Sequence, residues 1–339
     1  MSIVSRARAT EVYRTFWYFA TERQNVFLRR IGRQPAPWTD DPILAQFRFT
    51  NAYRASDRTS QYLIRSVIYR DDLPSSPDEV FFRIMLFKLF NKIETWELLE
   101  RSLGSVTFED WSLATFDSIL TQAMSSGQRI YSAAYIMPPG HGEWRWPLKH
   151  RTHLALLERM MADDVPERLL DIRSMQDGFE LLRSYPTIGN FLAYQYVIDI
   201  NYSELTNFSE MDFVVAGPGA RDGIRKCFSD ADRFTEAEII REVAEHQDQE
   251  LERFGVHFDS LWGRPLQLID CQNLFCEVDK YARVRHPDAR GISGRTRIKR
   301  RFVARREPLS CWYPPKWGLN ERIAAANVGG WPSLASAKE

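Results

Sequence analysis

The sequence Tyr185-Pro186-Thr187-Ile188-Gly189-Asn190-Phe191-Leu192-Ala193 places a proline turn and a glycine directly before an apolar run that continues to Ile200. Proline pre-sets the backbone of a turn, and glycine lets another backbone approach closely. The spacing of the apolar residues then predicts a helix over 189–200. The stretch therefore predicts two helices joined by a short hairpin. The simpler alternative is an ordinary helix start in which Pro186 only forms the turn.

The start of the second helix is a candidate site for a phosphate group. A helix N-terminus exposes backbone N–H groups and the positive end of the helix dipole. We therefore expect Thr187, Gly189 and Asn190 to contact a DNA backbone. The order of features resembles the helix-hairpin-helix of the DNA glycosylase superfamily, which flips its target base out of the duplex. This chain has Thr187 where that hairpin usually carries a second glycine, and it lacks the lysine that bifunctional lyases place near Phe191.

A single acid follows the hairpin in the sequence Met211-Asp212-Phe213-Val214-Val215. Its apolar neighbours predict burial, which raises the pKa of a carboxyl group and suits it to proton transfer. In the glycosylase superfamily the corresponding acid stabilises positive charge on the sugar or activates a nucleophile. Asp212 is accordingly a candidate catalytic residue, and a helix N-cap is the alternative role.

The charge of the chain is balanced overall but uneven along its length. The sequence has 45 basic and 45 acidic residues, so contact with nucleic acid must come from a local patch. Residues 283–306 contain ten basic residues and one acid, Asp288. We predict DNA contacts for Arg300 and Arg301 in this tract, whereas a solvated loop is the alternative.

Helical periodicity dominates the sequence, and alternating β-branched runs of useful length are missing. We predict an all-α, glycosylase-like fold with at most a small hairpin in the tail. Among its long helices are 77–103 and 235–254. Residues 1–282 form the helical region, with the hairpin near 183–200. Residues 283–339 form an irregular, Arg-rich and Pro-containing arm that packs on this region or extends from it.

The sequence argues against several other classes of protein. No apolar run reaches the roughly 18 residues that a membrane span needs, and the polar, basic N-terminus lacks the apolar stretch of a signal peptide. The four cysteines form no Cys-x-x-Cys pair and the six histidines are scattered, so we expect neither a metal site nor a cofactor. We expect a cytoplasmic protein of a bacterial or phage-infected cell.

The sequence Ala216-Gly217-Pro218-Gly219-Ala220-Arg221 predicts a tight turn whose N–H groups bind an anion. We expect Gly217, Gly219 and Arg221 to contact DNA there, and a plain loop between helices is the alternative. No Gly-Lys-Ser/Thr follows, so the turn is not a nucleotide-binding P-loop and this chain is not a P-loop kinase.

Two further polar clusters predict a binding pocket. The first follows one face of a helical segment at spacings of three and four and consists of Arg48, Asn51, Arg54, Asp57, Arg58 and Gln61. The second consists of Asp270, Gln272, Asn273, Glu277, Lys280 and Tyr281. Amides beside arginines suit a base and a phosphate. A solvated face and exposed salt bridges are the alternatives.

These blocks together resemble the α-glutamyl/putrescinyl-thymine pyrophosphorylase family, over nearly the whole chain from about Phe16 to Tyr281. The segments that carry the resemblance are Glu22-Arg23, Arg29-Arg30, Pro37-Trp38-Thr39-Asp40-Asp41-Pro42-Ile43-Leu44, Phe47-Arg48-Phe49-Thr50-Asn51, Tyr53-Arg54, Asp57-Arg58, Gln61-Tyr62-Leu63-Ile64, Phe90-Asn91 with Thr95, Ala134-Tyr135-Ile136, Gly217-Pro218-Gly219-Ala220 and Asp270 through Tyr281. The family includes amino acid:DNA transferases of thymidine hypermodification and the helical domain attached to 5-hydroxymethyluracil DNA kinases.

The resemblance implies a DNA base-modifying transferase with a functional link to a separate 5-hydroxymethyluracil DNA kinase. An amino acid or a polyamine would replace pyrophosphate on pyrophosphorylated 5-hydroxymethyluracil in DNA, with the base flipped out. In this interpretation the proton of the amine goes to Asp212 or Glu277. Cations hold the pyrophosphate, and the candidates are Arg48, Arg54, Arg58 and Lys280. The uracil edge is read by amides, for which Asn51, Gln272 and Asn273 are the candidates.

Other functions remain open at this point. A monofunctional DNA glycosylase for a modified pyrimidine would use the same hairpin and the same acid. A non-catalytic DNA-binding accessory of a 5-hydroxymethyluracil kinase would need only the hairpin and the basic tract. The neutral overall charge also leaves room for a helical protein that acts on nucleotides instead of DNA.

Overall fold

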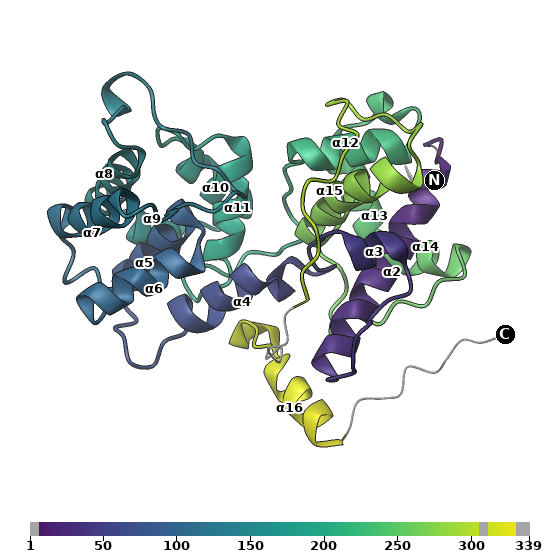
Figure 1. Cartoon of the computed structure of the whole chain (residues 1–339), viewed down its shortest axis with the longest axis horizontal. Helices are drawn as coiled ribbons and strands as arrows, with labels where there is room; N and C mark the ends of the chain where they lie inside the picture. Colours follow the sequence, from purple (N-terminus) through teal and green to yellow (C-terminus); the bar gives the residue numbers. More distant parts are fainter. Residues whose placement is uncertain (1–6, 305–310, 330–339) are drawn as a thin grey trace. The chain divides into compact units, whose positions relative to one another are not determined.

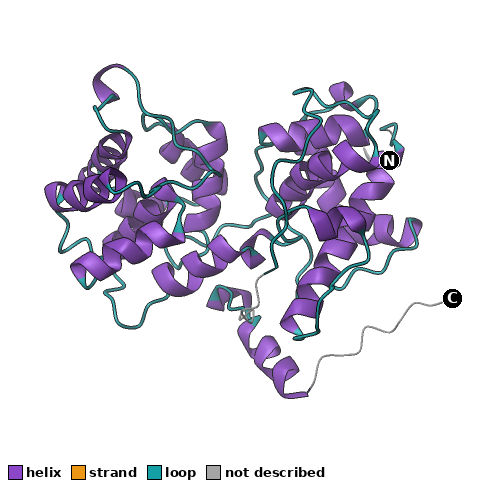
Figure 2. Cartoon of the chain, viewed as in Figure 1, coloured by secondary structure: helices purple, strands orange, loops and turns teal. Residues whose placement is uncertain are grey.

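A computed structural model describes residues 7–304 and 311–329 of the chain, with side chains up to residue 324 in the second range. Arg305 and Arg306 of the basic tract lie outside the described residues. Within those residues the secondary structure is helical, with isolated β-bridges and no β-strand (Figure 2). The all-α prediction is therefore confirmed. In the same part of the chain, no helix has the length and apolar character that crossing a bilayer requires.

The chain divides into two compact units. The first joins the chain up to Asp57 with the chain from Ala216 onward, and the second is the continuous stretch Arg58–Val215. Both regions predicted from the sequence, 1–282 and 283–339, contribute to the first unit. Residues far apart in sequence therefore meet there, and the predicted site residues are distributed over both units.

The first unit is organised around one long helix, α15. Its helical elements are α2 (Glu11–Ile31), α3 (Pro42–Gln46), η1 (Arg54–Ser56), α12 (Pro218–Cys227), η4 (Ala231–Arg233), α13 (Glu236–Glu245), α14 (Gln247–Arg253), α15 (Leu268–Arg285), η5 (Pro315–Trp317) and α16 (Asn320–Gly329). Helices α2, α3, α12 and α13, together with η1, all pack against α15 (Figure 1). Each of them is thereby fixed relative to the side chains that α15 carries.

Helix α2 forms for reasons that are visible in its sequence. The Thr10 side chain accepts a hydrogen bond from the N–H of Val12 and caps the first turn. Aromatic rings then recur on its inner face at helical spacing. The ring of Tyr13 lies 4.7 Å from that of Phe228, and the ring of Phe16 lies 4.6 Å from that of Phe275. This aromatic contact fastens α2 to α15.

Two glycines allow α12 to pack closely on α15. A Cβ atom on Gly219 would lie 2.3 Å from Sγ of Cys276, and one on Gly223 would lie 2.0 Å from the carbonyl oxygen of Phe275. Real Cβ atoms do not approach other atoms that closely, so only glycine fits. The sequence prediction of an open anion-binding turn over 216–221 differs from the structure, because Pro218 already begins a helix and Gly219 faces α15.

The second unit is organised around α5, which is buried on all sides although it carries the charged residues Glu79, Arg83 and Lys88. Its helical elements are α4 (Arg58–Leu63), η2 (Ile64–Ile68), α5 (Pro77–Phe90), α6 (Ile93–Leu103), α7 (Leu113–Ser125), η3 (Gly142–Trp144), α8 (Lys149–Ala162), α9 (Val165–Asp171), α10 (Met175–Arg183) and α11 (Asn190–Ile200). Helices α6, α8, α9 and α11, and the π-helical turn η2, pack against α5. The unit is therefore a helical bundle with a single central helix.

The predicted pair of helices is present as α10 and α11, which pack against each other. The turn between them holds Thr187 at φ 70°, in the left-handed region that favours glycine. Gly189 is the N-cap of α11, and no atom lies within 4 Å of where its Cβ would be. The N-terminus of α11 is thus approachable. The wider glycosylase-like fold remains a prediction.

Two long helices predicted from periodicity are interrupted in the structure. The stretch 77–103 breaks at Asn91, whose φ of 48° ends α5 before α6 begins. The stretch 235–254 breaks at His246, between α13 and α14. Asparagine tolerates the left-handed conformation better than most residues, so the first break has a local signal.

Candidate functional site

The segment 47–57 packs along α15 in the first unit, and two carboxylates of α15 hold its backbone. Oδ1 of Asp270 accepts the N–H of Arg54 at 2.7 Å, and its Oδ2 accepts the N–H of Gln267 at 3.0 Å. About two turns further on, Oε2 of Glu277 accepts the N–H of Thr50 at 3.0 Å. Asp270 and Arg54 are both buried. Asp270 therefore caps α15 and fixes η1 at once.

A tight turn within this segment joins Asn51 and Asp57. The N–H of Asn51 donates to Oδ1 of Asp57 at 2.8 Å, and its Nδ2 donates to the carbonyl oxygen of Ser56 at 2.6 Å. Nδ2 of Asn51 is thus already bound to the backbone, whereas the sequence analysis expected this amide to read a base edge. The same bonds set the position of the Asp57 carboxylate.

A buried arginine of α2 completes the polar cluster. Arg23 is only 9% exposed, and its Nη1 has no hydrogen-bond partner among the described residues. Burial lowers the pKa of Arg23 to about 10, while the charges of Asp57 and Glu277 act in the opposite direction. A buried guanidinium with an unused N–H is well suited to receive an anionic or carbonyl oxygen from a ligand.

Asp57 has the properties of a proton-transfer group. Burial raises the pKa of its carboxyl to about 6, and the charge of Glu277 acts in the same direction. The N–H of Asn51 and the charges of Arg23 and Arg54 oppose that rise without cancelling it. An acid that titrates near neutral pH can take up and release a proton during a reaction. Sequence analysis placed Asp57 in the binding pocket but did not single it out for this role.

Glu277 and Lys280 form an ion pair at the edge of the cluster. Nζ of Lys280 lies 2.6 Å from Oε2 of Glu277, the same oxygen that accepts the Thr50 N–H. The ammonium group also lies 5.4 Å from the centre of the Phe49 ring. The buried Glu277 carboxylate thus holds both the backbone of the segment and a partly exposed cation.

The basic tail meets the same segment. The N–H of Arg48 donates to the carbonyl oxygen of Arg300 at 3.0 Å, and an antiparallel bridge joins Phe47 to Arg301. The guanidinium of Arg301 lies 4.8 Å from the centre of the Phe47 ring. Instead of forming a hairpin of its own, the tail therefore pairs with the segment 47–57 and adds exposed arginines beside it.

Polar residues of the α12–α15 contact have partners within the protein. The N–H of Gly217 donates to Oε1 of Gln272 at 3.2 Å, and Nε2 of Gln272 donates to Oδ1 of Asn273 at 2.9 Å. Arg221 is exposed and lies 3.8 Å from Glu236. The Gly217 N–H is therefore used inside the fold, so the proposed anion-binding turn loses one of its donors.

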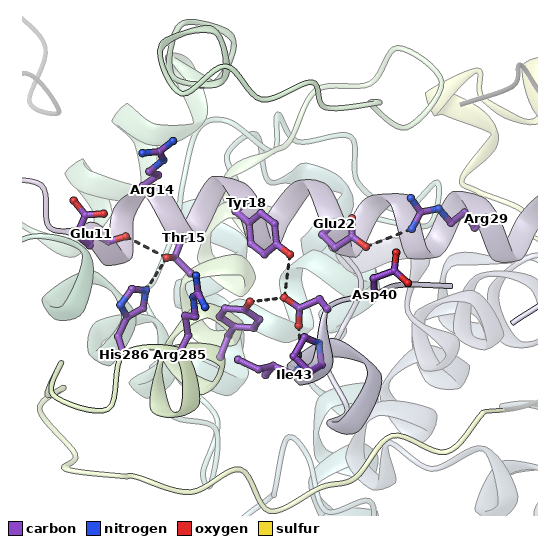
Figure 3. Close-up of a pocket in the computed structure, with 13 residues that line it drawn as sticks. Glu11, Arg14, Thr15, Tyr18, Glu22, Arg29, Asp40, Ile43, Arg285 and His286 are labelled. Atoms are coloured by element: carbon purple, nitrogen blue, oxygen red, sulfur yellow. Dashed lines mark hydrogen bonds and ion pairs between the residues drawn. The ribbon is translucent and has the colours of Figure 1, made fainter. Parts of the chain in front are cut away.

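A cavity of about 720 Å³ lies beside α2 (Figure 3). The hydroxyl groups of Tyr18 and Tyr281 both donate to Oδ2 of Asp41, at 3.0 and 2.6 Å. Tyr281, which the sequence placed in the binding pocket, therefore lines this cavity. Charged residues of both signs also line it, namely Glu11, Arg14, Glu22, Arg29, Asp40 and Arg285.

The other predicted site residues lie in the second unit and are Arg58, Gln61, Thr187, Gly189, Asn190 and Asp212. Asp212 is exposed in a bend, and the N-cap of the following helix is Gly217. The expectations of a buried acid and of a helix N-cap at Asp212 are therefore both wrong. The bend leaves the Asp212 side chain in solvent while apolar neighbours such as Val214 face the interior. Gly189 and Asn190 are exposed at the start of α11, where a phosphate can reach them.

The histidine pair on α8 is used within the second unit. Nε2 of His150 lies 2.7 Å from Oδ1 of Asp117, whereas His153 contacts the Tyr131 hydroxyl and the Pro138 carbonyl through its two ring nitrogens. Burial lowers the pKa of His153 to about 4. These partners explain the pair without a metal ion. A group of three ligand-type side chains near the end of α13 consists of Glu242, Glu245 and His246.

The comparisons with known proteins support one part of the resemblance seen in the sequence, namely that to the helical domain of 5-hydroxymethyluracil DNA kinases. A family model described as the helical domain of 5-hmdU DNA kinase matches residues 10–291. The chain belongs to this family. A 5-hmdU DNA kinase of Bacillus phage SP10 is 27% identical over 294 residues, which cover 81% of this chain and 46% of the phage protein. This chain thus spans about half the length of that relative. No solved structure matches it.

Proposed function

We propose that this protein modifies 5-hydroxymethyluracil in DNA by exchanging pyrophosphate on the base for an amine. The proposal rests on one observation above all: the chain belongs to the family of 5-hmdU DNA kinase helical domains, and in it the half-buried Asp57 lies in a cluster with the buried Arg23 and Glu277. Such a cluster offers both a cation for a leaving anion and a carboxylate that titrates near neutrality. The phosphorylation itself is assigned to a separate kinase activity.

The reaction needs a proton acceptor. The amine nitrogen forms a bond to the 5-methylene carbon, the bond from that carbon to the pyrophosphate oxygen breaks, and pyrophosphate leaves with the electron pair. The nitrogen then carries an extra proton. We assign this proton to Asp57, because a carboxylate with a pKa of about 6 accepts it at neutral pH. Glu277, a catalytic candidate from the sequence, forms an ion pair with Lys280 and thereby holds that cation in place.

The leaving group needs cations. Pyrophosphate carries several negative charges, and preorganised cations stabilise that charge as it develops. We assign this task to Arg23, with its unused Nη1, and to Lys280 and Arg48 at the exposed edge. The co-substrate is an amino acid or a polyamine. In the first unit we assign contacts with the DNA backbone to Arg300 and Arg301, and in the second unit the N-terminus of α11 is a separate candidate for a phosphate contact.

The first experiment is mass spectrometry of nucleosides from treated DNA. The DNA carries 5-hydroxymethyluracil that a kinase has first pyrophosphorylated. The reaction contains amino acids and polyamines. We expect an aminated thymidine from the parent protein. Loss of that product in Asp57→Asn and in Arg23→Met, with the fold retained by circular dichroism, supports the assignment. Asp212→Asn is the test for the residue favoured by the sequence alone, and Glu252→Gln, an exposed acid on α14, is the control.

The alternatives give different products. Free base together with an abasic site identifies a DNA glycosylase. Unchanged DNA that is nevertheless bound tightly identifies a non-catalytic accessory of the kinase. Either result overturns the transferase proposal.

A further inference from the structure

Residues 287–304, here called the strap, follow α15 and run over the first unit without forming a helix (Figure 1). The strap is rich in cations and poor in apolar side chains. Its basic residues are Arg290, Arg295, Arg297, Lys299, Arg300 and Arg301, and its single acid is Asp288. A segment of this composition buries too little apolar surface to hold itself in place, so its position must come from other contacts.

The first anchor of the strap is Asp222 on α12. This carboxylate is only 1% exposed, and its Oδ1 accepts the N–H of Ser293 at 2.8 Å. Its Oδ2 accepts the hydroxyl of the same serine. Gly291 presses against the carboxylate so closely that a Cβ atom there would lie 2.8 Å from Oδ1. Two hydrogen bonds from one loop residue satisfy this buried charge and fix the position of the loop, because leaving the charge unpaired is costly.

Two more anchors follow along the strap. Nη1 of Arg283 donates to the carbonyl oxygen of Arg297 at 2.9 Å, while the same guanidinium is held by Asp279. Farther on, the N–H of Arg48 donates to the carbonyl oxygen of Arg300, and the N–H of Phe302 donates to that of Gln46 at 3.0 Å. All of these bonds use the backbone of the strap, so none of them occupies one of its basic side chains, although the Arg301 guanidinium lies over the Phe47 ring.

The basic side chains of the strap point to solvent. Arg290, Arg295, Arg297, Lys299, Arg300 and Arg301 are all exposed, and none has an ion-pair partner among the described residues. Residues 295–300 contain no turn or helix. Within residues 295–301 the strap carries five exposed cations, which are Arg295, Arg297, Lys299, Arg300 and Arg301. Like charges at such close spacing repel one another unless an anion faces them.

We propose that the strap is a docking track for the phosphate backbone of DNA, and that Asp222 sets its position. The choice of DNA as the polyanion rests on the proposed function. B-DNA carries one negative charge on each phosphate of both strands, so a run of six exposed cations suits a contact with its backbone. A cavity of about 450 Å³ lies at the beginning of the strap, and its lining includes Arg225, Arg285 and Arg290 together with Glu11 and Asp288. Asp222 acts as a positioning residue, since it is buried beneath the strap.

The test compares two acids whose removal changes the charge equally. Asp222→Ala and Asp288→Ala each add one net positive charge, which by itself strengthens DNA binding. We expect Asp288→Ala to bind a fluorescent, unmodified DNA duplex as tightly as the parent or tighter. We expect Asp222→Ala to bind about 5-fold or more weakly, because the released strap no longer aligns its cations with phosphates. Fluorescence anisotropy at 50–200 mM salt measures both.

A second variant guards against loss of folding in Asp222→Ala. Gly291→Val lies on the strap itself and pushes it off Asp222 without removing any charge or core residue. It is expected to weaken DNA binding in the same way, with a circular dichroism melt like that of the parent. In addition, Arg295→Gln/Arg297→Gln/Lys299→Gln is expected to reduce the slope of log K against log salt by about 2 to 3.

The outcomes separate this proposal from the proposed function. The strap proposal is overturned if folded Gly291→Val binds DNA like the parent, or if the parent does not bind duplex DNA at 50 mM salt. Weakened binding in Gly291→Val without any aminated thymidine from the parent leaves the strap in place and removes the transferase. Aminated thymidine with unchanged binding in the variants leaves the transferase in place and removes the strap.

Discussion

Replacing Asp57 with asparagine is expected to stabilise the protein at neutral pH while it abolishes amine transfer. Asparagine keeps the shape of the side chain, and its carbonyl oxygen can still accept the N–H of Asn51. It also mimics the protonated acid at every pH. The variant therefore isolates the free energy that the folded protein spends on holding Asp57 ionised.

The sign and size of the effect follow from the pKa of Asp57. Burial raises this pKa from 3.8 to about 6, so between these values the folded protein binds a proton that the unfolded chain has lost. Stability contributed by the protonated acid is complete below about pH 4 and disappears as the pH rises through about 6. The difference between the two pKa values corresponds to at most about 3 kcal/mol. Because the side chain is only half-buried, solvent screening lowers this figure, and the expected effect on the free energy of unfolding lies between about 1 and 3 kcal/mol.

The assay is urea unfolding of parent and variant from pH 4.5 to 7.5, followed by circular dichroism. The informative quantity is the difference between the two unfolding free energies, because contributions of other titrating groups cancel in it. We expect this difference to grow with pH in favour of Asp57→Asn and to level off above about pH 7. Asp288→Asn serves as the control and should show no such trend. Parallel profiles for parent and Asp57→Asn would refute the reasoning and remove the basis for Asp57 as a proton acceptor.

Three further predictions follow from the same structure. Gly223→Ala should destabilise the first unit by about 3 kcal/mol or more in urea unfolding, because the new Cβ meets the Phe275 carbonyl. Gly189→Val should leave stability nearly unchanged but weaken binding in a DNA anisotropy assay, since the space around Gly189 is open to a phosphate. His153→Gln should make the protein less sensitive to acid between pH 6.5 and 4, because burial lowers the pKa of His153 to about 4 and the parent loses stability as the pH falls through that window.

The acid sensitivities of His153 and Asp57 oppose each other. The parent gains stability from Asp57 and loses it at His153 as the pH falls. A single pH profile of the parent can therefore look flat, and only the parent-minus-variant differences separate the two residues. A His153→Gln profile parallel to that of the parent would contradict the pKa assigned to this histidine.

Local sequence signals predicted the elements that are set by local chemistry. Pro186 and Gly189 precede α11 as expected, because turns and helix starts depend on neighbouring residues. Gly219 was assigned to an anion-binding turn because its true neighbour, Cys276, is remote in sequence. Helix packing of that kind leaves no local trace beyond the glycine itself.

The same limit applies to the candidate site. The sequence put Asp57 and Glu277 in two polar clusters but could not show that the clusters meet. Arg23 was missed because a basic residue on an amphipathic helix usually lies in solvent; its one signal was a position in line with the apolar residues of α2. Asp212 was assigned burial from its neighbours, although the chain bends there and turns only the apolar residues inward.

The way α15 holds the N-terminal segment has a consequence for how the chain folds. Asp41 bonds to Tyr281, Thr50 to Glu277 and Arg54 to Asp270, across separations of 240, 227 and 216 residues. The second unit is continuous in sequence, so it can fold as soon as it leaves the ribosome, whereas the first unit must wait for α15. Loop closure over such distances is costly in chain entropy, and prior folding of the intervening residues shortens the effective loop. The candidate site of the first unit therefore assembles only after α15 has been made, because its residues come from both ends of the chain.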